Sequence, residues 1–445
     1  MIKFPKDLYA DVRMEEVTET VIAYENGKLR QNKESATRGA FLRVYDGKRW
    51  YYCATTELDS LQKELDSLAA MATPNAEILS DPVVRRFQVN KDVVMRFEDV
   101  DLREVPNQEK LALVESYLPV LSEVEQIGVS FAYYSDKHSV RSFYSSLGAD
   151  ITYDYQHAGI ALAYTMTAGD SPFQNSQRLY AQSFAALQNQ HQKLRESIAT
   201  DLDYALHAVP VEPGSYTCVL APVVTGVFAH ESFGHKSEAD FMLGSETMRR
   251  EWAIGTKVGW DGLNIMDSGI PDGSGYAPYD DEGTKATQTY LIKDGVLMGR
   301  LHSATTAAAL DEELTGNARA KDFGFEPIVR MTATYIGGGK DSLETLLKGA
   351  EGGIYIPDYN HGSGMSTFTI APARAYRIRD GKIAEPLRVS VISGNVMETL
   401  HKIDGATVET ELNSSVFGGC GKMEQFPLRV SHGGPYLRVR DINVQ

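Results

Sequence analysis

The alternation of apolar and polar residues near the start of the chain predicts β-strands. Glu16–Arg30 and Arg38–Thr55 have the pattern of strands around the dipeptides Asn26-Gly27 and Asp46-Gly47. Both dipeptides are typical of tight hairpin turns, because Asn, Asp and Gly tolerate the left-handed backbone that such turns need. These two stretches therefore predict antiparallel strands.

A second alternating region follows later in the chain. Val129–Met166 alternates apolar and polar residues in three runs, which break near Asp136–Ser139 and Leu147–Asp150. A period of two is typical of strands with one face buried. The region therefore predicts an antiparallel meander of three strands.

Segments with the spacing of helices lie between and after these strands. Leucines recur at helical spacing over Glu57–Met71, Asn107–Gly128 predicts a helix that Pro119 would kink, and Ser176–Ala208 predicts a long closing helix. An order of strands, helices, strands and helix favours the α+β class with an antiparallel sheet.

Glycine usage divides the chain. Seven of the 38 glycines lie in residues 1–200 and the others follow. The second part therefore predicts many short strands joined by turns, and the sequence AVPVEPG near His207–Pro213 interrupts the helical pattern between the two parts. We expect an N-terminal α+β domain at 1–208, with an antiparallel sheet and long helices, and a C-terminal β-rich domain at 209–445.

Charge and composition exclude several classes of function. The net charge is −16 and basic clusters are no longer than two residues, so direct binding to nucleic acid is not expected. No apolar run is long enough to span a membrane, and the N-terminus turns acidic before an apolar signal region forms. The odd set of cysteines, Cys53, Cys218 and Cys420, fits a reducing cytosol, so a cytoplasmic protein is expected.

Residues 221–241 contain the chemistry that distinguishes this sequence. His230 and Glu231 are adjacent, and His235, Glu238 and Asp240 follow closely. Neutral imidazole is a good zinc ligand, and a carboxylate beside it can take a proton from the attacking water of a hydrolytic reaction. Glu238 and Asp240 either accept hydrogen bonds that orient the histidines or are solvated helix charges; we expect the orienting role for at least one of them.

The spacing of the histidines requires an interruption of the helix. His230 and His235 stand at i and i+5, which leaves their side chains about 140° apart on an ideal α-helix. Gly234 directly precedes His235, and glycine permits a break or a π-type bulge. We therefore predict that the helix ends, kinks or bulges between Ser232 and His235.

The residue pattern alone does not identify the third metal ligand. The candidates are Cys218, Cys420, His302, His361, His401 and His432. Cys420 lies among glycines that allow close approach to a metal, and Lys422 would favour its thiolate form. Cys218 lies in an apolar strand pattern and is better explained as core.

Several motifs in order resemble the TldD/PmbA family of zinc metalloproteases, long labelled modulators of DNA gyrase. The stretch HESFGHKSEAD at 230–240 is similar to the family motif HExxxHxxExD. Further similarities are found in Asp280–Thr284 (DDEGT), Leu314–Arg319 (TGNxR), Pro327–Tyr335 (PxxRMTxTY), Gly353–Tyr355 (GIY) and Gly419–Lys422 (CGK). The resemblance covers 205–445 and, more loosely, the N-terminal part.

The resemblance implies a fold, a site and partners. It implies a barrel-like C-terminal domain that carries a metal-binding helix, one Zn²⁺ per chain held by His230, His235 and Cys420, and Glu231 as general base. It also implies unfolded or modified peptides as substrates, and a homodimer or a heterodimer with a PmbA-like chain. We expect the segment Gly362, Ser363 and Gly364 to lie close to bound peptide.

Two alternatives remain beside this interpretation. One is a non-catalytic regulatory protein acting on DNA gyrase or its inhibitors, with a structural metal. A structural site needs no base beside its ligands and is usually closed by four protein ligands. The other is a metal-dependent amidase acting on small molecules, which a small closed pocket would favour.

Overall fold

A long, curved sheet forms the first part of the protein in the computed structural model, which describes residues 2–168 and 171–445. Its strands run in the order β3-β2-β1-β5-β6-β4, with β7 also paired to β6. The strands are β1 (Tyr9–Glu25), β2 (Lys28–Tyr45), β3 (Trp50–Thr55), β4 (Lys91–Val94), β5 (Ile127–Ser145), β6 (Asp150–Ala168) and β7 (Ser171–Ala181). The neighbours are antiparallel apart from β4 and β6, which confirms the predicted antiparallel sheet.

The first predicted turn is confirmed. Asn26 and Gly27 both have positive φ, 47° and 72°, as the two central residues of a type I′ hairpin require.

The predicted break at Asp136–Ser139 is wrong, because β5 continues through it. The buried carboxylate of Asp136 lies 2.6 Å from Lys110 Nζ and accepts a hydrogen bond from Tyr134, so these polar residues are satisfied inside the strand.

The long helix predicted at Ser176–Ala208 is also wrong in its first part. Residues up to Ala181 form β7, whose backbone pairs with β6 from Ala158 to Ala168. The helix α3 begins only at His191 and ends at His207. Helix α1 (Leu61–Met71) and helix α2 (Asn107–Ser122), which contains Pro119, lie where the spacing predicted them, although α2 ends before Gly128.

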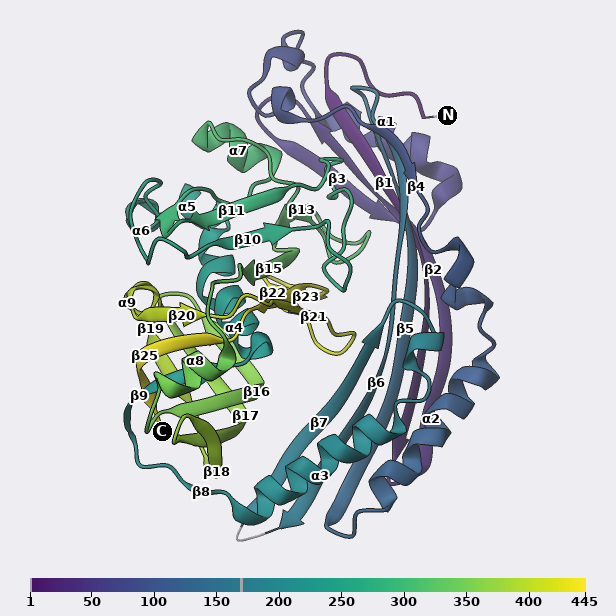
Figure 1. The fold of residues 1–445 in the computed structure, drawn as a ribbon. Helices are drawn as coiled ribbons and strands as arrows, with labels where there is room; N and C mark the ends of the chain where they lie inside the picture. Colours follow the sequence, from purple (N-terminus) through teal and green to yellow (C-terminus); the bar gives the residue numbers. More distant parts are fainter. Residues whose placement is uncertain (1, 169–170) are drawn as a thin grey trace.

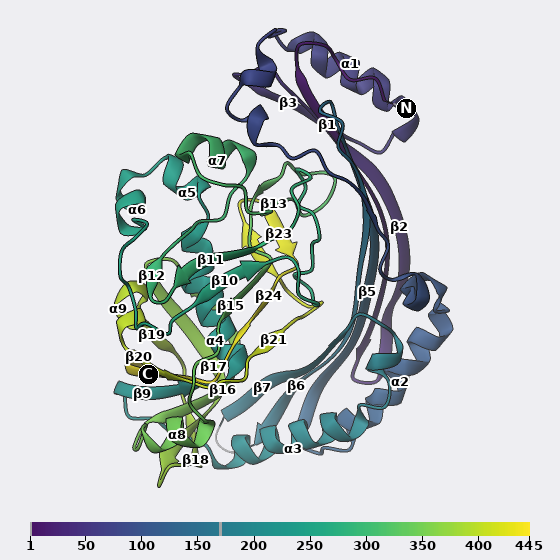
Figure 2. The same ribbon diagram turned by 45° about the horizontal axis from the view of Figure 1, so that its top comes forward.

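The sheet curves around the second half of the chain. Figures 1 and 2 show its concave side facing the C-terminal strands, with α2 on the opposite, convex side. Apolar residues of α2 and α3 pack with the sheet in one buried cluster that includes Tyr117, Tyr134, Ile160 and Ile198.

The helices in the described part of the chain include none with the length and apolar character of a membrane span.

Strands of the second half close into a barrel. The strands β9 (Gly214–Leu220), β25 (Leu437–Val444), β19 (Ile392–Asn395), β17 (Thr367–Arg379) and β16 (Ile354–Gly364) pair in that order, and β16 also pairs with β9, which completes the ring. Strand β18 (Lys382–Arg388) carries β8 (Val209–Pro210), and β20 (Ile403–Ala406) pairs with β25. The barrel-like architecture expected from the resemblance is thereby confirmed.

A further sheet, small strand pairs and short helices surround the barrel. The sheet order is β12-β11-β10-β15-β24-β21, comprising Val296–Leu297, Gln288–Lys293, Ile265–Ser268, Ala333–Ile336, Ser431–Gly434 and Glu411–Asn413. Two hairpins pair β13 (Ala318–Arg319) with β14 (Ile328–Val329), and β22 (Cys420–Lys422) with β23 (Gln425–Leu428). The helices are α4 (Pro222–Ala229), α5 (Asp240–Leu243), α6 (Glu246–Glu251), α7 (Ala304–Leu310), α8 (Leu343–Lys348) and α9 (Val396–His401).

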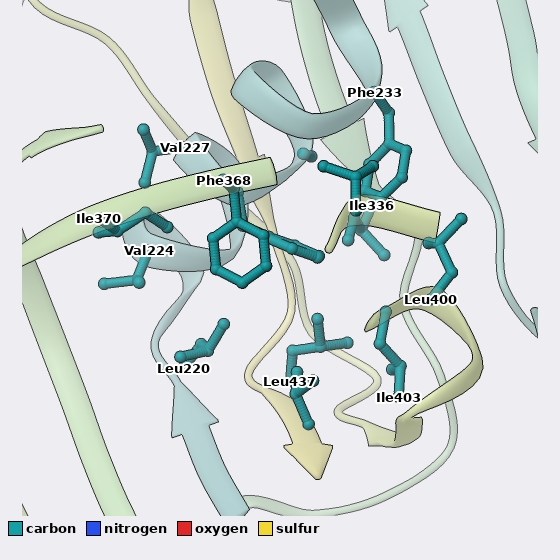
Figure 3. Close-up of a cluster of buried hydrophobic side chains, with 14 of the residues drawn as sticks. Leu220, Val224, Val227, Phe233, Ile336, Phe368, Ile370, Leu400, Ile403 and Leu437 are labelled. Carbon is teal, nitrogen blue, oxygen red and sulfur yellow. The ribbon is translucent and has the colours of Figure 1, made fainter. Parts of the chain in front are cut away.

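Helix α4 lies between the barrel and this second sheet. Its residues Val224 and Val227 join Phe368, Ile370 and Ile336 in one buried cluster, drawn in Figure 3. Because α4 is apolar on nearly every side and buried, it is fixed in position by packing rather than by caps. The residues directly after α4 are therefore rigidly placed.

Buried ion pairs join the curved sheet to the second half. Arg141 of β5 lies 2.7 Å from Asp281 and 3.0 Å from Glu15, and Arg43 of β2 lies 2.9 Å from Glu282. All of these side chains are nearly inaccessible, so leaving any one of them unpaired would be strongly destabilising. The boundary between domains at residues 208 and 209 stays a prediction.

Candidate metal centre

A π-helical turn directly follows α4. Residues His230–Gly234 form this turn, and His235–Ser237 continue as a 3₁₀ turn. The His235 N–H bonds to the His230 carbonyl, five residues earlier, so one extra residue is accommodated in the turn. The predicted interruption between Ser232 and His235 is confirmed, and it brings both imidazoles to the same side.

Close packing explains the glycine in this turn. A Cβ atom added at Gly234 would lie 1.9 Å from Sδ of Met331. The φ of Gly234 is −56°, so the backbone angle does not require glycine, but the neighbouring side chain does. The turn is thus held against Met331, and any side chain at position 234 would push the two apart.

The structure brings His230, His235 and Cys420 together. Their nitrogen and sulfur atoms all lie within 4.8 Å of one another, and the two imidazole rings are 5.1 Å apart. The sulfur of Cys420 lies 3.5 Å from Nε2 of His235. Cys420 begins β22, after Gly418 and Gly419 with φ of 81° and 152°. Residues with a side chain rarely adopt such positive φ angles, so both positions favour glycine.

The thiol and the imidazoles alter each other's protonation. Burial raises the pKa of Cys420, but His230 and His235 outweigh burial and lower it to about 5. Burial lowers the pKa of His235, but its contacts with Cys420 and Glu238 outweigh burial and raise it. The Lys422 ammonium, expected to favour the thiolate, contacts the carboxylates of Glu238 and Asp240, and the main groups that lower the thiol pKa are the two imidazoles.

Glu238 and Asp240 have different surroundings. The buried carboxylate of Glu238 lies 3.2 Å from Nδ1 of His235 and 3.1 Å from Nζ of Lys422. Asp240 contacts Lys422 at 2.7 Å but has no contact with either histidine among the described hydrogen bonds. Of the two carboxylates, Glu238 is therefore placed to orient His235.

Glu231 lies beside the cluster and is partly exposed. Burial raises the pKa of its carboxyl group, although His230 and His235 lower it in part. Gly362 and Gly364 of β16 pack closely on it: a Cβ at Gly364 would lie 2.7 Å from the Glu231 carbonyl oxygen. A side chain at either glycine would collide with its neighbours, so the close packing explains both glycines. Ser363 between them is exposed and forms a hydrogen bond with Thr369.

The remaining candidates for a third ligand lie apart from this cluster. Cys218 is buried in β9, where burial raises the pKa of its thiol to about 12, which fits the core role expected for it. His302 bonds to Thr306 and Glu312, His361 and His401 are exposed, and His432 bonds to the hydroxyl of Tyr359. The ring of His432 lies 6.4 Å from that of His230.

Arg330 is a structural element of the site whose role the sequence did not indicate. It is fully buried, and its guanidinium donates to the carbonyl oxygens of Cys420 at 2.8 Å and Gln425 at 3.2 Å. It therefore holds the β22–β23 hairpin in place beneath the thiol. The sequence signal that could have indicated this role is that Arg330 is charged, whereas the rest of the stretch Ile328–Ile336 is not.

The cluster fits a metal ion such as zinc. Imidazole nitrogen and thiolate sulfur are the ligands zinc takes most often in proteins. Among the described residues, Nδ1 of His230 is buried and has no hydrogen-bond partner. A buried nitrogen without a partner is costly unless another group binds it, as a metal ion held by these residues would.

Comparisons with known proteins match the chain to metallopeptidases. Residues 213–445 match the profile of the PmbA/TldA metallopeptidase C-terminal domain, and residues 10–72 match PmbA/TldA metallopeptidase domain 1. The chain is 32% identical to the metalloprotease slr0863 of Synechocystis sp., over 98% of this chain and 94% of the relative. It is 27% identical to the zinc metalloprotease TldD homolog of Saccharolobus solfataricus, over 98% and 96%.

Solved structures share the fold. TldE from Thermococcus kodakarensis superposes with a TM-score of 0.74 at 15% identity, over 98% of this chain and 96% of that one. A Thermotoga maritima protein described as a candidate modulator of a DNA gyrase gives a TM-score of 0.76 at 19% identity, over 98% and 96%. The profile match over residues 213–445 and the relative that is 32% identical over 98% of this chain show that the chain belongs to the TldD/PmbA family and is a metallopeptidase.

Proposed function

We propose that this chain is a zinc-dependent peptidase that hydrolyses unfolded or modified peptides bound in extended form. The observation that carries the proposal is the convergence of His230, His235 and Cys420 within 4.8 Å, beside the partly exposed Glu231. Three protein donors with one open position are typical of catalytic zinc, whereas structural zinc is usually closed by four. The name of the Saccharolobus solfataricus relative, a zinc metalloprotease, supports zinc.

The ligand residues are His230, His235 and Cys420, with Glu238 orienting His235. When bound, zinc supplies a Lewis acid that polarises the scissile carbonyl and acidifies water. Glu231 would accept a proton from the attacking water and return it to the leaving amine. The raised pKa of Glu231, caused chiefly by burial, suits a group that must both accept and release a proton near neutral pH.

The free edge of β16 supports binding of an extended peptide. Strand β9 pairs with β16 only at Ile354–Ile356, whereas β17 pairs along β16 as far as Gly364. Among the described strands, the edge after Ile356 thus has no partner on the β9 side, and it leads past Glu231 at Gly362 and Gly364. A peptide adding to this edge would be recognised through its main chain, which favours unfolded substrates and broad specificity.

The cellular setting is part of the proposal. We infer a cytoplasmic protein that acts as a homodimer or as a heterodimer with a PmbA-like chain, without direct contact with nucleic acid or membrane. The net charge of −16 supports the absence of nucleic-acid binding. The dimer rests on the family resemblance.

One variant tests the catalytic proposal. Glu231→Gln keeps the shape of the side chain but removes the base, so turnover of an unfolded peptide should fall about 10²–10⁴-fold. Zinc content and peptide binding should stay near those of the parent, because the ligands and the edge of β16 are intact. Glu246→Gln, on an exposed residue of α6, is the matched control and should keep full turnover.

The same experiment addresses the non-catalytic alternative. Turnover by Glu231→Gln equal to that of the parent would refute the general-base mechanism. If the parent binds zinc and retains the peptide but shows no detectable turnover, a binding protein with a structural metal would be favoured.

A further inference from the structure

A cavity lies between the curved sheet and the second half of the chain. Its volume is about 330 Å³, and its walls include Tyr153 and Tyr155 of β6, Tyr276, and Pro427 and Leu428 of β23. That volume is within the range of small-ligand sites, which often lie between domains. We call it the interdomain cavity; it does not include His230, Glu231, His235 or Cys420.

The charges that line the interdomain cavity do not cancel. Arg141 and Lys137 line it but have carboxylate partners: Glu15 and Asp281 for Arg141, and Glu19 at 3.8 Å for Lys137. Three other cations line it as well: Arg319, Lys321 and Arg429. Within residues 2–168 and 171–445, none of these three has a carboxylate within the 4.0 Å of an ion pair.

The partners of the unpaired arginines carry no charge. Arg319 is 8% exposed and donates to the carbonyl oxygens of Met331 and Arg429. Arg429 donates to the carbonyl oxygen of Gly418. Carbonyl oxygens satisfy hydrogen bonds without neutralising charge, and burial lowers the pKa of both guanidinium groups. Asp322 is the remaining carboxylate of the lining, so positive charge is in excess there although the chain as a whole is strongly acidic.

The interdomain cavity adjoins the metal centre. Leu428, in its wall, is the strand partner of Cys420, and Cα atoms of paired antiparallel residues are about 4.5–5.5 Å apart. Arg319 bonds to the carbonyl of Met331, whose side chain packs on Gly234 of the metal-binding turn. The interdomain cavity therefore lies against the β22–β23 hairpin that carries Cys420.

We propose that the interdomain cavity binds a carboxylate of the peptide substrate, through Lys321, Arg429 and the more deeply buried Arg319. Unpaired guanidinium groups form strong, charge-assisted hydrogen bonds with carboxylates, and the tyrosine walls can cover the adjacent apolar part of a peptide. The proposal rests on the proposed peptidase function for the identity of its ligand. It adds a charge preference to an otherwise main-chain mode of recognition.

The carboxylate has two sources, the C-terminus of a peptide or an acidic side chain, and binding measurements can distinguish them. Three synthetic peptides of equal length serve as probes: one of neutral residues with a free C-terminus, the same peptide amidated, and an amidated peptide with glutamates replacing two residues. Binding is measured by calorimetry to the full-length Glu231→Gln protein loaded with zinc. The test thus needs no cleavage, and failure of the peptidase mechanism would leave its result intact.

We expect at least one carboxylate-bearing peptide to bind about tenfold or more tightly than the neutral amidated one. The double variant Lys321→Gln/Arg429→Gln should abolish this difference while leaving binding of the amidated peptide unchanged. Both side chains are partly exposed, so the protein should fold. Arg377→Gln is the matched control, since Arg377 is also partly exposed and bonds to a carbonyl, that of Gly352, away from the cavity.

The results have clear meanings. Preference for the free C-terminus, or for the glutamate peptide, lost in the double variant and kept in Arg377→Gln, would support the proposal and identify the source. Equal binding of the three peptides to the Glu231→Gln protein, or a preference that survives when Lys321→Gln/Arg429→Gln is added to it, would overturn the proposal.

Discussion

Nδ1 of His235 lies 3.2 Å from the carboxylate of Glu238, three residues further along the chain. This contact leaves Nε2 facing the Cys420 sulfur at 3.5 Å, so the carboxylate fixes which nitrogen is directed to the metal centre. Glu238 is fully buried and is itself held by Lys422. The contact therefore orients the imidazole from inside the protein rather than from the solvent side.

Replacing Glu238 should weaken zinc binding. Glu238→Gln removes the charge that orients His235, and loss of such a partner typically lowers metal affinity about 10–100-fold. Competition with a chromogenic chelator measures the change. Asp240→Asn is the control: Asp240 contacts Lys422 but neither histidine, so its affinity should stay within about threefold of the parent. Equal losses in both variants would contradict the orienting role.

The two buried cysteines should respond differently to substitution. Cys420→Ala should lose most bound zinc, because one of three donors is removed from a cluster whose atoms lie within 4.8 Å. Cys218→Ala should keep zinc, because Cys218 is a core residue of β9 and is not one of the three residues that could hold the metal. Metal analysis of the purified proteins gives the answer, and undiminished zinc in Cys420→Ala would exclude Cys420 as a ligand.

A methyl group at Gly234 should disturb both stability and the metal centre. Gly234→Ala places Cβ 1.9 Å from Met331 Sδ, and overpacking of this kind typically costs about 1–3 kcal/mol. Displacement of Met331 also moves its neighbour Arg330, which holds the carbonyl of Cys420, so zinc affinity should fall as well.

The control for this substitution is Gly244→Ala. Gly244 has no atoms within 4 Å of an added Cβ and a negative φ of −96°, so its midpoint of thermal unfolding should change little. Similar midpoints for the two alanine variants would show that the packing at Gly234 is not restrictive.

Glu15 should make stability depend on pH in the acid range. Burial raises the pKa of Glu15, but Arg141 and other cations outweigh burial and lower it from 4.5 to about 2. Because the folded-state pKa is depressed, its stabilising contribution is complete above about pH 4.5 and is lost as the pH falls toward 2. The slope from this one group is at most about 1.4 kcal/mol per pH unit.

Denaturant unfolding at several pH values tests this linkage. Glu15→Gln should be less stable than the parent at pH 6, and the difference should shrink as the pH approaches 2. Glu16→Gln is the matched control on the adjacent, exposed residue and should follow the parent. A difference between Glu15→Gln and the parent that is independent of pH would refute the linkage.

Local features of the fold could be predicted from the sequence. The turn at Asn26-Gly27, the buried leucines of α1 and the interruption after Ser232 follow from short patterns, because each depends on residues that are neighbours in the chain. The family motifs added the barrel-like second half, which periodicity alone did not give.

Tertiary structure decided what depends on residues far apart in the chain. Residues 176–181 joined a strand rather than a helix because β6 offered an edge to pair with, and Asp136 stayed inside β5 because Lys110 neutralises it. Lys422 lies against the carboxylates of Glu238 and Asp240. Cys420 reaches His235 across 185 residues only because Arg330 and Met331 hold both segments, and packing of that kind has no signature in a local pattern.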